Sequence, residues 1–361
     1  MSVDERYRAV VELLNAQHAE DPGFSAQVCA QVDGRMVVDA AVGDDLRPDS
    51  LVCVFSVSKG LTGICMAILI ERGLLDPTAA VADYWPEFAA AGKGAITVAQ
   101  ALSHQAGLPF LPPVSREEFL SDELAAPLLA AARPVWSPGS MFGYHPVTAG
   151  VIAGTLMRRI TGVSISDFWE SEVRGASGLE AWFVLPEELE ARVAPVRLPD
   201  LPPIPPGADQ ITDRIAEPLV GIPGFDVVAN TRAGHTAGMP AASAVASARG
   251  IAGAYGAALW GGLLSDETID IVGQIQVDGL DGTNGLPSRY GILFQKPCPA
   301  RPFAGWRAFG HDGAAGALGF ADPDCGVVFG FTTNRPAPAG GDRRADDLAA
   351  MVRDIAVSSR G

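Results

Sequence analysis

The sequence predicts an α+β fold in which an antiparallel sheet is flanked by helices, and three observations support it. Strand-like segments occur near both ends of the chain, at residues 24–43 and 307–335. The long region between them consists of helical pieces broken by proline and glycine. The chain also begins and ends with amphipathic helical patterns. This order predicts one α/β sheet domain built from both termini (residues 1–75 and 239–361) and an inserted all-helical domain (residues 76–238).

The N-terminal part of the sheet domain is predicted to be a helix, a hairpin and a second helix. Residues 4–18 place apolar side chains at helical spacing. The stretch FSAQVCAQVDGRMVVDAAVG (24–43) contains two strands around Asp33-Gly34, a dipeptide typical of tight hairpin turns. The next helix, SVSKGLTGICMAILIERGLL (56–75), is apolar nearly all round and is therefore expected to be buried.

The inserted domain is predicted to contain helices separated by loops. Helical patterns mark ITVAQALSHQAGL (96–108), PVTAGVIAGTLMRRITG (146–162) and ISDFWESEV (165–173). The stretch PDLPPIPPGAD (199–209) is expected to form a stiff, polyproline-like loop. Such a loop suits the lid or edge of a cleft and equally a plain surface linker.

The C-terminal part returns to the pattern of a sheet domain. SARGIAGAYGAALWGGLL (247–264) predicts a helix. RAFGHDGAAGALGFADPDCGVVFGFTTNR (307–335) predicts three short strands, the last two joined by a turn at residues 322–324. GDRRADDLAAMVRDIAV (341–357) predicts a closing helix.

Composition and charge exclude several classes of protein. The chain has 361 residues, of which 48% are hydrophobic and 19% charged, so it can bury a sizeable core. Its net charge of −16, without a basic patch, is unfavourable for binding nucleic acid or an anionic membrane. No apolar run reaches the roughly 18 residues of a membrane span. We therefore expect a small-molecule partner, and the oligomeric state stays open.

The cysteines and the N-terminal residues indicate the compartment in which the protein is expected to occur. The five cysteines are scattered and include no CxxC pair. The first residues are charged and lack the apolar region of a secretion signal. We therefore expect free, buried thiols in a reduced, cytoplasmic environment.

The motif that carries chemistry is S-x-x-K, formed by Ser56 and Lys59, one of only three lysines in the chain. Residues i and i+3 share a face of a helix, so the two side chains can meet, while Ser58 points elsewhere. A serine becomes a nucleophile when a base takes its proton. Burial lowers the pKa of a lysine amine, and the apolar residues that follow make burial of Lys59 expected. The helix start also directs backbone N–H groups at the serine, which helps to form an oxyanion site.

A second segment, PVWSPGSMFGYHPVTAGVIAG (134–154), places Tyr144 just before a predicted helix. A tyrosine there can act as a phenolate or as a proton shuttle if a neighbouring ammonium lowers its pKa. The alternative is a half-buried structural tyrosine.

A third segment, FGHDGAAGALGF (309–320), places His311-Asp312-Gly313 at the end of a predicted strand. Its glycines allow a close approach of the backbone to a substrate, and the N–H of Ala314 can be a second oxyanion donor. On its own, a histidine in this position is more often structural.

Together these segments resemble the serine β-lactamase and penicillin-binding-protein superfamily, and within it the family VIII carboxylesterases. FSVSKGLTG resembles the nucleophile box, ALSHQAGLP the family's His-x-x-Gly-Leu-Pro segment, and WSPGSMFGYHPVTAGVIAG its Trp-x-Pro-Gly…Gly-Tyr-His stretch. GMPAASAVASARGIAGAYGAALWGGLLS resembles the segment before the third box, and FGHDGAAGALGFADPDCGVVFGFTTNR the C-terminal strands. The resemblance spans almost the whole chain. It implies a mixed α/β domain of the β-lactamase/transpeptidase type, an inserted helical domain, and a cleft between them that carries all three boxes.

The resemblance also implies a role for each matched residue. Ser56 is the acylated nucleophile, Lys59 and Tyr144 share the base and acid roles, and the N–H groups of Ser56 and Ala314 form the oxyanion hole. The implied reaction is a two-step acyl transfer through an acyl-enzyme, which needs no metal or cofactor. The residues expected to contact the substrate are His311, Asp312, Gly313, Trp136 and His145.

Two departures from the β-lactamase pattern bear on the substrate. Pro146 stands where β-lactamases have an asparagine, so the side-chain amide that would hold a lactam is missing. His311, largely neutral near pH 7, stands where a lysine would pair with the lactam carboxylate. Each such charge-assisted bond contributes about 1.5–3 kcal/mol, so neutral esters should be preferred. Asp312, where Thr or Ser is usual, either discourages anions further or orients His311.

The leading hypothesis is a serine carboxylesterase that acts on a small neutral ester with a short or medium acyl chain. An acyltransferase acting on a specialised metabolite is a close alternative, because both would use the same acyl-enzyme. A β-lactamase or D-peptidase is a third possibility. A catalytically inactive binding protein is the least favoured, because Ser56, Lys59 and Tyr144 are all present.

Overall fold

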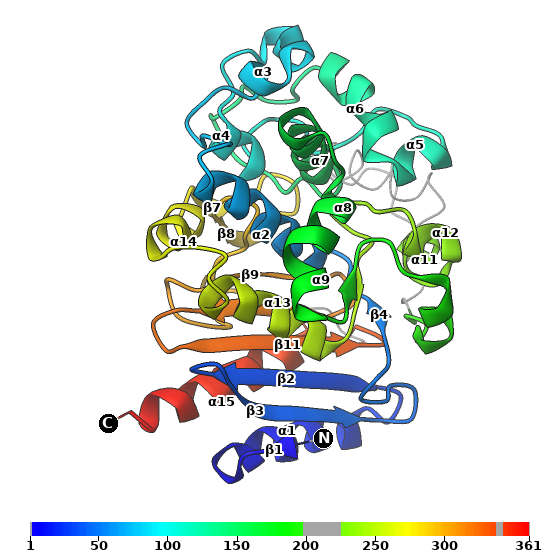
Figure 1. Cartoon of the computed structure of the whole chain (residues 1–361), viewed down its shortest axis with the longest axis vertical. Coiled ribbons are helices and arrows are strands. Elements are labelled where there is room, and N and C mark those ends of the chain that lie inside the picture. Colours follow the sequence, from blue (N-terminus) through cyan, green and yellow to red (C-terminus); the bar gives the residue numbers. More distant parts are fainter. Residues whose placement is uncertain (1, 198–224, 337–341, 361) are drawn as a thin grey trace.

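The computed structural model describes residues 2–197, 225–336 and 342–360. Its main sheet has six antiparallel strands in the order β1-β3-β2-β11-β10-β9 (Figure 1). The first three strands come from the N-terminal part of the chain and the last three from the C-terminal part, which confirms the predicted fold class. The strands are β1 (Ser2–Val3), β2 (Ala26–Val32), β3 (Arg35–Val42), β9 (Phe309–Asp312), β10 (Leu318–Asp322) and β11 (Val327–Thr333).

The two ends of the chain meet where β2 pairs with β11. This ladder runs from Ala26 opposite Thr333 to Val32 opposite Val327. The turn between β2 and β3 has positive φ angles at Asp33 (48°) and Gly34 (75°), as a tight hairpin turn requires. The predicted hairpin and the predicted C-terminal strands are therefore confirmed.

Helices cover both faces of this sheet (Figure 1). Alternate side chains of β2 point to opposite faces of the sheet: Val28 and Ala30 belong to one hydrophobic cluster, and Cys29 belongs to another. The first cluster is completed by α1 (Arg8–Glu20) and α15 (Arg344–Ser358), and the second by α2 (Val57–Glu71) and α13 (Ala248–Trp260).

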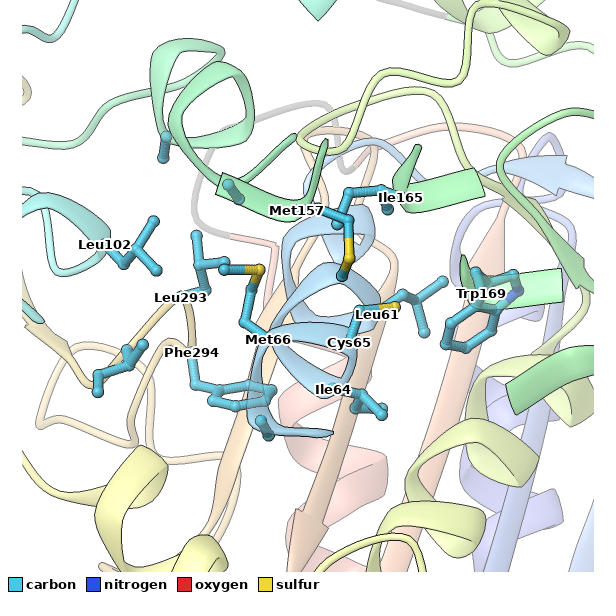
Figure 2. Close-up of a cluster of buried hydrophobic side chains, with 14 of the residues drawn as sticks. Leu61, Ile64, Cys65, Met66, Leu102, Met157, Ile165, Trp169, Leu293 and Phe294 are labelled. Atoms are coloured by element: carbon cyan, nitrogen blue, oxygen red, sulfur yellow. The ribbon is translucent and has the colours of Figure 1, made fainter. Parts of the chain in front are cut away.

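Helix α2 runs through the centre of the second cluster. All of its residues from Val57 to Leu69 are buried, as its sequence predicts. Figure 2 shows its apolar side chains surrounded by residues from both the predicted sheet domain and the predicted insert, such as Phe294 and Trp169. A side-chain carbon at Gly63 would lie 2.7 Å from Phe294, and one at Gly60 would lie 2.1 Å from the hydroxyl of Tyr255. Glycine is therefore needed at both positions for the close packing of α2.

Helices α3 to α7 of the predicted insert lie beyond α2, on the side away from the six-stranded sheet, whereas α8 packs beside α2 (Figure 1). A three-stranded sheet, in the order β4-β6-β5, links the predicted parts, since β5 comes from the insert. The division into domains stays a prediction. The two strands of this small sheet that come from outside the predicted insert are β4 (Val52–Cys53) and β6 (Val245–Ala246). The described elements of the predicted insert, besides α4 (treated below), are α3 (Val81–Tyr84), η2 (Pro86–Gly92), α5 (Arg116–Leu120), α6 (Asp122–Ala131), α7 (Thr148–Thr161), α8 (Ile165–Trp169), η3 (Glu170–Arg174), α9 (Gly175–Ser177), β5 (Ala181–Trp182), η4 (Glu187–Arg192), α11 (Phe225–Asn230) and α12 (Arg232–His235).

Parts of the predicted secondary structure were wrong or incomplete. The helix expected over 96–108 is only α4 (Val98–Leu102), because His104 adopts a positive φ of 68° that a helix cannot continue. Sequence reasoning also missed α14 (Asp266–Gly273) and the hairpin of β7 (Val277–Leu280) and β8 (Pro287–Tyr290). The proline-rich stretch 199–209 lies outside the described residues.

Two expectations, one about the cysteines and one about membrane spans, can be compared with the structure. All five cysteines are free and buried, as predicted. Among the residues that the structure describes, no helix has both the length and the apolar character that a membrane span requires.

Candidate active site

Ser56 lies at the N-terminal end of α2, at a sharp turn after β4. Phe55, directly before it, has a φ of +46°, in the left-handed region that a bulky side chain rarely adopts. The Ser58 hydroxyl holds this turn, because it donates to the Phe55 carbonyl at 2.5 Å and accepts the N–H of Ala244 at 3.0 Å. Ser56 is partly exposed and Ser58 is fully buried, so only Ser56 is presented for chemistry.

The amine of Lys59 lies beside this hydroxyl, one helical turn further along. Its Nζ is 3.1 Å from Ser56 Oγ, 2.6 Å from the Pro146 carbonyl oxygen and 3.0 Å from the Ala241 carbonyl oxygen. The side chain is fully buried, and burial lowers the pKa of Lys59 to about 7, against an opposing effect of the Asp312 carboxylate. Near neutral pH, a large fraction of the molecules therefore carries an uncharged amine.

The three contacts of Lys59 fit a general base. Carbonyl oxygens only accept hydrogen bonds, so the two hydrogens of a neutral amine go to Pro146 and Ala241. The remaining tetrahedral position, which holds the lone pair, then points at Ser56 Oγ. The surroundings of Lys59 thus favour the orientation in which the amine can take the serine proton.

Tyr144 approaches the same oxygen from the loop before α7. Its hydroxyl donates to Ser56 Oγ at 2.7 Å, and its ring stacks on Tyr290 with 6.0 Å between ring centres. Burial raises the pKa of Tyr144 well above its ordinary value, and the carboxylates of Asp312 and Asp281 raise it further, against the hydrogen bond to Ser56. The condition for a phenolate, a pKa lowered by a neighbouring ammonium, is therefore not met. The tyrosine is a protonated donor at neutral pH.

Asp281, which sequence reasoning missed, holds the backbone of Tyr144. The N–H of Tyr144 lies 3.0 Å from each oxygen of this buried carboxylate. Thr283 adds its own N–H at 2.8 Å and its hydroxyl at 2.6 Å. The available signal was the pair of turn dipeptides Asp281-Gly282 and Asn284-Gly285, which mark the hairpin that carries the carboxylate.

Replacing Asp281 with asparagine should loosen Tyr144 without removing it. The amide has one acceptor oxygen in place of two, and its NH₂ group faces N–H donors. We expect kcat on a neutral ester to fall about tenfold, with a smaller change in KM, and the free energy of unfolding to fall by about 1–3 kcal/mol. Steady-state kinetics and thermal unfolding measure both quantities. The matched control is Asp278→Asn, an exposed residue of the same hairpin that pairs with Arg289. Equal losses of kcat in both variants would contradict a specific anchor.

His145 lies in the interior rather than at the surface of the site. Its Nε2 accepts the N–H of Leu108 at 3.0 Å, and its Nδ1 donates to the Gly143 carbonyl at 2.6 Å. Both ring nitrogens are thus occupied by the backbone, so the expectation of substrate contact through His145 is not supported, and the residue fixes the loop instead. Trp136 packs edge-on against His145, with ring centres 5.9 Å apart, and is partly exposed. Its contact with a substrate stays a prediction.

The third box lies next to the second. The His311 ring centre is 6.0 Å from that of Tyr144, and the His311 side chain is buried. Asp312 forms an ion pair with Arg301, a residue that sequence reasoning missed because it lies in no motif. The negative charge of the Asp312 carboxylate is therefore paired with a positive charge of the protein itself.

The expected oxyanion donors lie on two segments that pack together. A side-chain carbon at Gly313 would lie 2.3 Å from the Val54 carbonyl oxygen, so the third box lies directly against the segment that leads into Ser56. Ala314, the next residue, is exposed. Within residues 2–197, 225–336 and 342–360, no hydrogen-bond acceptor is paired with the N–H of Ser56 or of Ala314. As far as the described residues show, both donors are thus available to bind an oxyanion.

Comparison with known proteins shows the family of the chain. The family model described as Beta-lactamase matches residues 14–353, nearly the whole chain. The chain belongs to the beta-lactamase family. The family resemblance and the fold that the motifs predicted are thereby confirmed.

Members and neighbours of the beta-lactamase family resemble the chain over most of its length. The esterase/beta-lactamase LipL of Mycobacterium tuberculosis is 30% identical, with 92% of this chain and 82% of LipL covered. The structure of EstA from Arthrobacter nitroguajacolicus Rue61a is 38% identical, with a TM-score of 0.94 and coverage of 100% of this chain and 99% of EstA. A crystal structure of a family VIII carboxylesterase is 30% identical, with a TM-score of 0.89 and coverage of 98% and 99%.

The second box contributes a backbone group to the site of this beta-lactamase family member. Pro146 gives its carbonyl oxygen to Lys59 and has no side-chain amide to offer a substrate. The structure thus brings Ser56, Lys59, Tyr144 and His311 together and turns His145 inward.

Proposed function

We propose that this protein is a serine carboxylesterase that forms an acyl-enzyme on Ser56. One observation carries the proposal: Ser56 Oγ contacts both the Lys59 amine, at 3.1 Å, and the Tyr144 hydroxyl, at 2.7 Å. A base and a proton donor that both contact one hydroxyl suit acyl transfer. The names of two proteins similar to this chain, a family VIII carboxylesterase and the esterase/beta-lactamase LipL, support esters as the substrate class.

Acylation begins when Lys59 takes the proton of Ser56 and Oγ attacks the ester carbonyl carbon. The carbonyl oxygen becomes an oxyanion, which the N–H groups of Ser56 and Ala314 stabilise. The carbon–oxygen bond to the alcohol then breaks. The leaving oxygen receives a proton from Tyr144, whose hydroxyl regains one from the Lys59 ammonium.

Deacylation repeats these steps with water. Lys59 takes a proton from the water as its oxygen attacks the acyl-enzyme, and Ser56 Oγ leaves with a proton from the same relay. An alcohol in place of water would give a new ester by the same route. Hydrolysis and acyl transfer therefore differ only in which acceptor reaches the acyl-enzyme.

The residues around the catalytic group support a neutral substrate. Pro146 offers no amide to a lactam, and burial lowers the pKa of His311 in spite of the neighbouring Asp312. At neutral pH, the third box therefore has no cation for a substrate carboxylate.

An acyl-chain series with trapping of the intermediate tests the proposed function. The wild-type protein is given p-nitrophenyl esters from acetate to decanoate, and intact mass spectrometry of quenched samples detects the acyl adduct. We expect hydrolysis of the shorter esters and an adduct on the peptide that contains Ser56. Added methanol measures the share of acyl transfer, and nitrocefin measures lactam hydrolysis. Turnover of nitrocefin as fast as that of the esters, or no ester turnover and no adduct, would contradict the proposal.

A further inference from the structure

The buried imidazole of His311 has a defined hydrogen-bond pattern. Its Nδ1 lies 2.8 Å from the backbone carbonyl oxygen of Asp312. Because a carbonyl only accepts, Nδ1 carries the hydrogen, and in the neutral ring Nε2 is left as a lone pair. In the part of the chain that the structure describes, this buried Nε2 has no hydrogen-bond partner. The third box thus contains an uncharged imidazole, and the protonation state of this ring depends on the groups around it.

One carboxylate, that of Asp312, is close enough to change the protonation state of His311. Asp312 Oδ1 lies 3.4 Å from His311 Nδ1, whereas Oδ2 pairs with Nη1 of Arg301. Two other nitrogens of Arg301 bind the carboxylate of Asp346, with Nε–Oδ2 at 2.9 Å and Nη2–Oδ1 at 3.1 Å. The side chain of Asp346 is fully buried, so this bidentate pair fixes the guanidinium next to Asp312.

The other groups that surround His311 do not supply a negative charge. Helix α2 contributes Lys59, whose charge opposes protonation of His311. The loop before α7 contributes Tyr144, and α13 contributes Tyr255, whose hydroxyl lies against the same glycine of α2 as the His311 side chain. The pKa values of both tyrosines are raised by burial, so both are neutral. Buried His104 is also neutral, because burial lowers its pKa. Burial lowers the pKa of His311, and among these neighbours Asp312 is the group whose negative charge raises it.

We propose that Arg301 is a specificity-determining residue: by pairing with Asp312 it keeps His311 uncharged, so that the site takes neutral acyl groups and rejects acyl groups that carry a carboxylate. The inference rests on the proposed esterase function and deepens it by naming the excluded substrate class. Arg301 acts through Asp312 and His311 and is not itself a catalytic residue.

Removing the guanidinium should reverse this preference. Without Arg301, the Asp312 carboxylate stands 3.4 Å from the imidazole without a cation, and this favours the imidazolium. A charged ring next to Tyr144 would attract a substrate carboxylate through its charge. The change should appear at low pH and fade as pH rises, because the imidazolium loses its proton.

The test compares two esters of one acyl chain, one with a free carboxylate and one in which a methyl ester removes the charge. The substrates are mono-p-nitrophenyl glutarate, which carries a carboxylate, and methyl p-nitrophenyl glutarate, which is neutral. The measured quantity is the ratio of their kcat/KM values from about pH 5.5 to 8.5. In Arg301→Gln we expect the ratio to rise on the order of tenfold at the acid end, and to return toward the wild-type value at the alkaline end. An unchanged ratio across this range would overturn the inference.

Three further variants separate charge from structural damage. Arg301→Gln leaves Asp346 buried without its cation, so Arg301→Gln/Asp346→Asn serves if the single variant does not fold, with the same expected gain. Asp346→Asn alone keeps the pair with Asp312 and should keep the wild-type ratio; the same gain in this variant would overturn the inference. Arg301→Gln/Asp312→Asn removes the carboxylate as well and should restore the wild-type ratio.

The same data separate this inference from the proposed function. If the wild type hydrolyses neither ester, the esterase proposal fails. If the wild type hydrolyses the neutral ester and the ratio does not respond to Arg301→Gln, only the inference about Arg301 fails.

Discussion

Replacing Ser56 with alanine should abolish hydrolysis of p-nitrophenyl butyrate and leave the fold intact. The substitution removes the oxygen that would form the acyl bond, and Ser56 is a partly exposed residue whose hydroxyl is not part of the packed core. We expect kcat/KM to fall by at least about 10⁴-fold, the scale at which removal of a nucleophile acts. Steady-state kinetics measures the loss, and thermal unfolding shows that the protein is still folded.

The same variant tests the labelling chemistry. A fluorophosphonate probe should modify the wild-type protein and not Ser56→Ala. A variant that keeps a substantial part of the wild-type rate, or that is still labelled, would place the nucleophile on another residue.

Replacing Lys59 with methionine should lower kcat by about 10²-fold or more, the usual scale for loss of a general base. Methionine fills much of the buried volume but cannot take a proton, so Ser56 Oγ loses the amine that lies 3.1 Å away. Steady-state kinetics on p-nitrophenyl butyrate measures the effect. A loss of less than about tenfold would make Lys59 a minor participant.

The chain offers a matched control for this substitution. Lys93 is also buried and also binds carbonyl oxygens, those of Ala90, Ala130 and Ala132, at 2.6–2.9 Å. No serine hydroxyl is among its contacts in the described structure. Lys93→Met should therefore lower stability and leave kcat of the folded protein nearly unchanged, and an equal loss of kcat would point to general damage.

Local rules were sufficient for the first half of the candidate site. The i, i+3 spacing of Ser56 and Lys59 puts both side chains on one face of a helix, and the apolar run that follows predicts burial. The hairpin at Asp33-Gly34 follows from turn chemistry in the same way. In each case, residues close in sequence decide the geometry, so the sequence alone is enough.

The second half depends on contacts between distant segments. Tyr144 is held by Asp281, 137 residues away, and Asp312 is held by Arg301 from a segment without a motif. His145, next to Tyr144 in sequence, turns inward because Leu108 and Gly143 occupy its ring nitrogens. Such pairings are set by the tertiary fold, which residue spacing does not reveal.

The helix that ends early illustrates the same limit. Helical periodicity continues through residues 96–108, but the chain leaves the helix at Leu102 and His104 takes a φ of 68°. His104 then accepts the N–H of His145 at 3.2 Å and packs edge-on against Tyr144, with ring centres 5.0 Å apart. Tertiary contacts around Tyr144 thus override the local helical preference.

The central claim is that Lys59 carries an uncharged amine near neutral pH, and a direct titration tests it. The chain has only three lysines, so protein labelled with ¹³C at lysine Cε gives three signals, and Lys59→Met identifies the one from Lys59. We predict that the Lys59 signal titrates near pH 7, whereas the buried Lys296 titrates near pH 8. A Lys59 midpoint near its ordinary value of 10.5 would mean that the amine is charged at neutral pH, and this would contradict its assignment as the base.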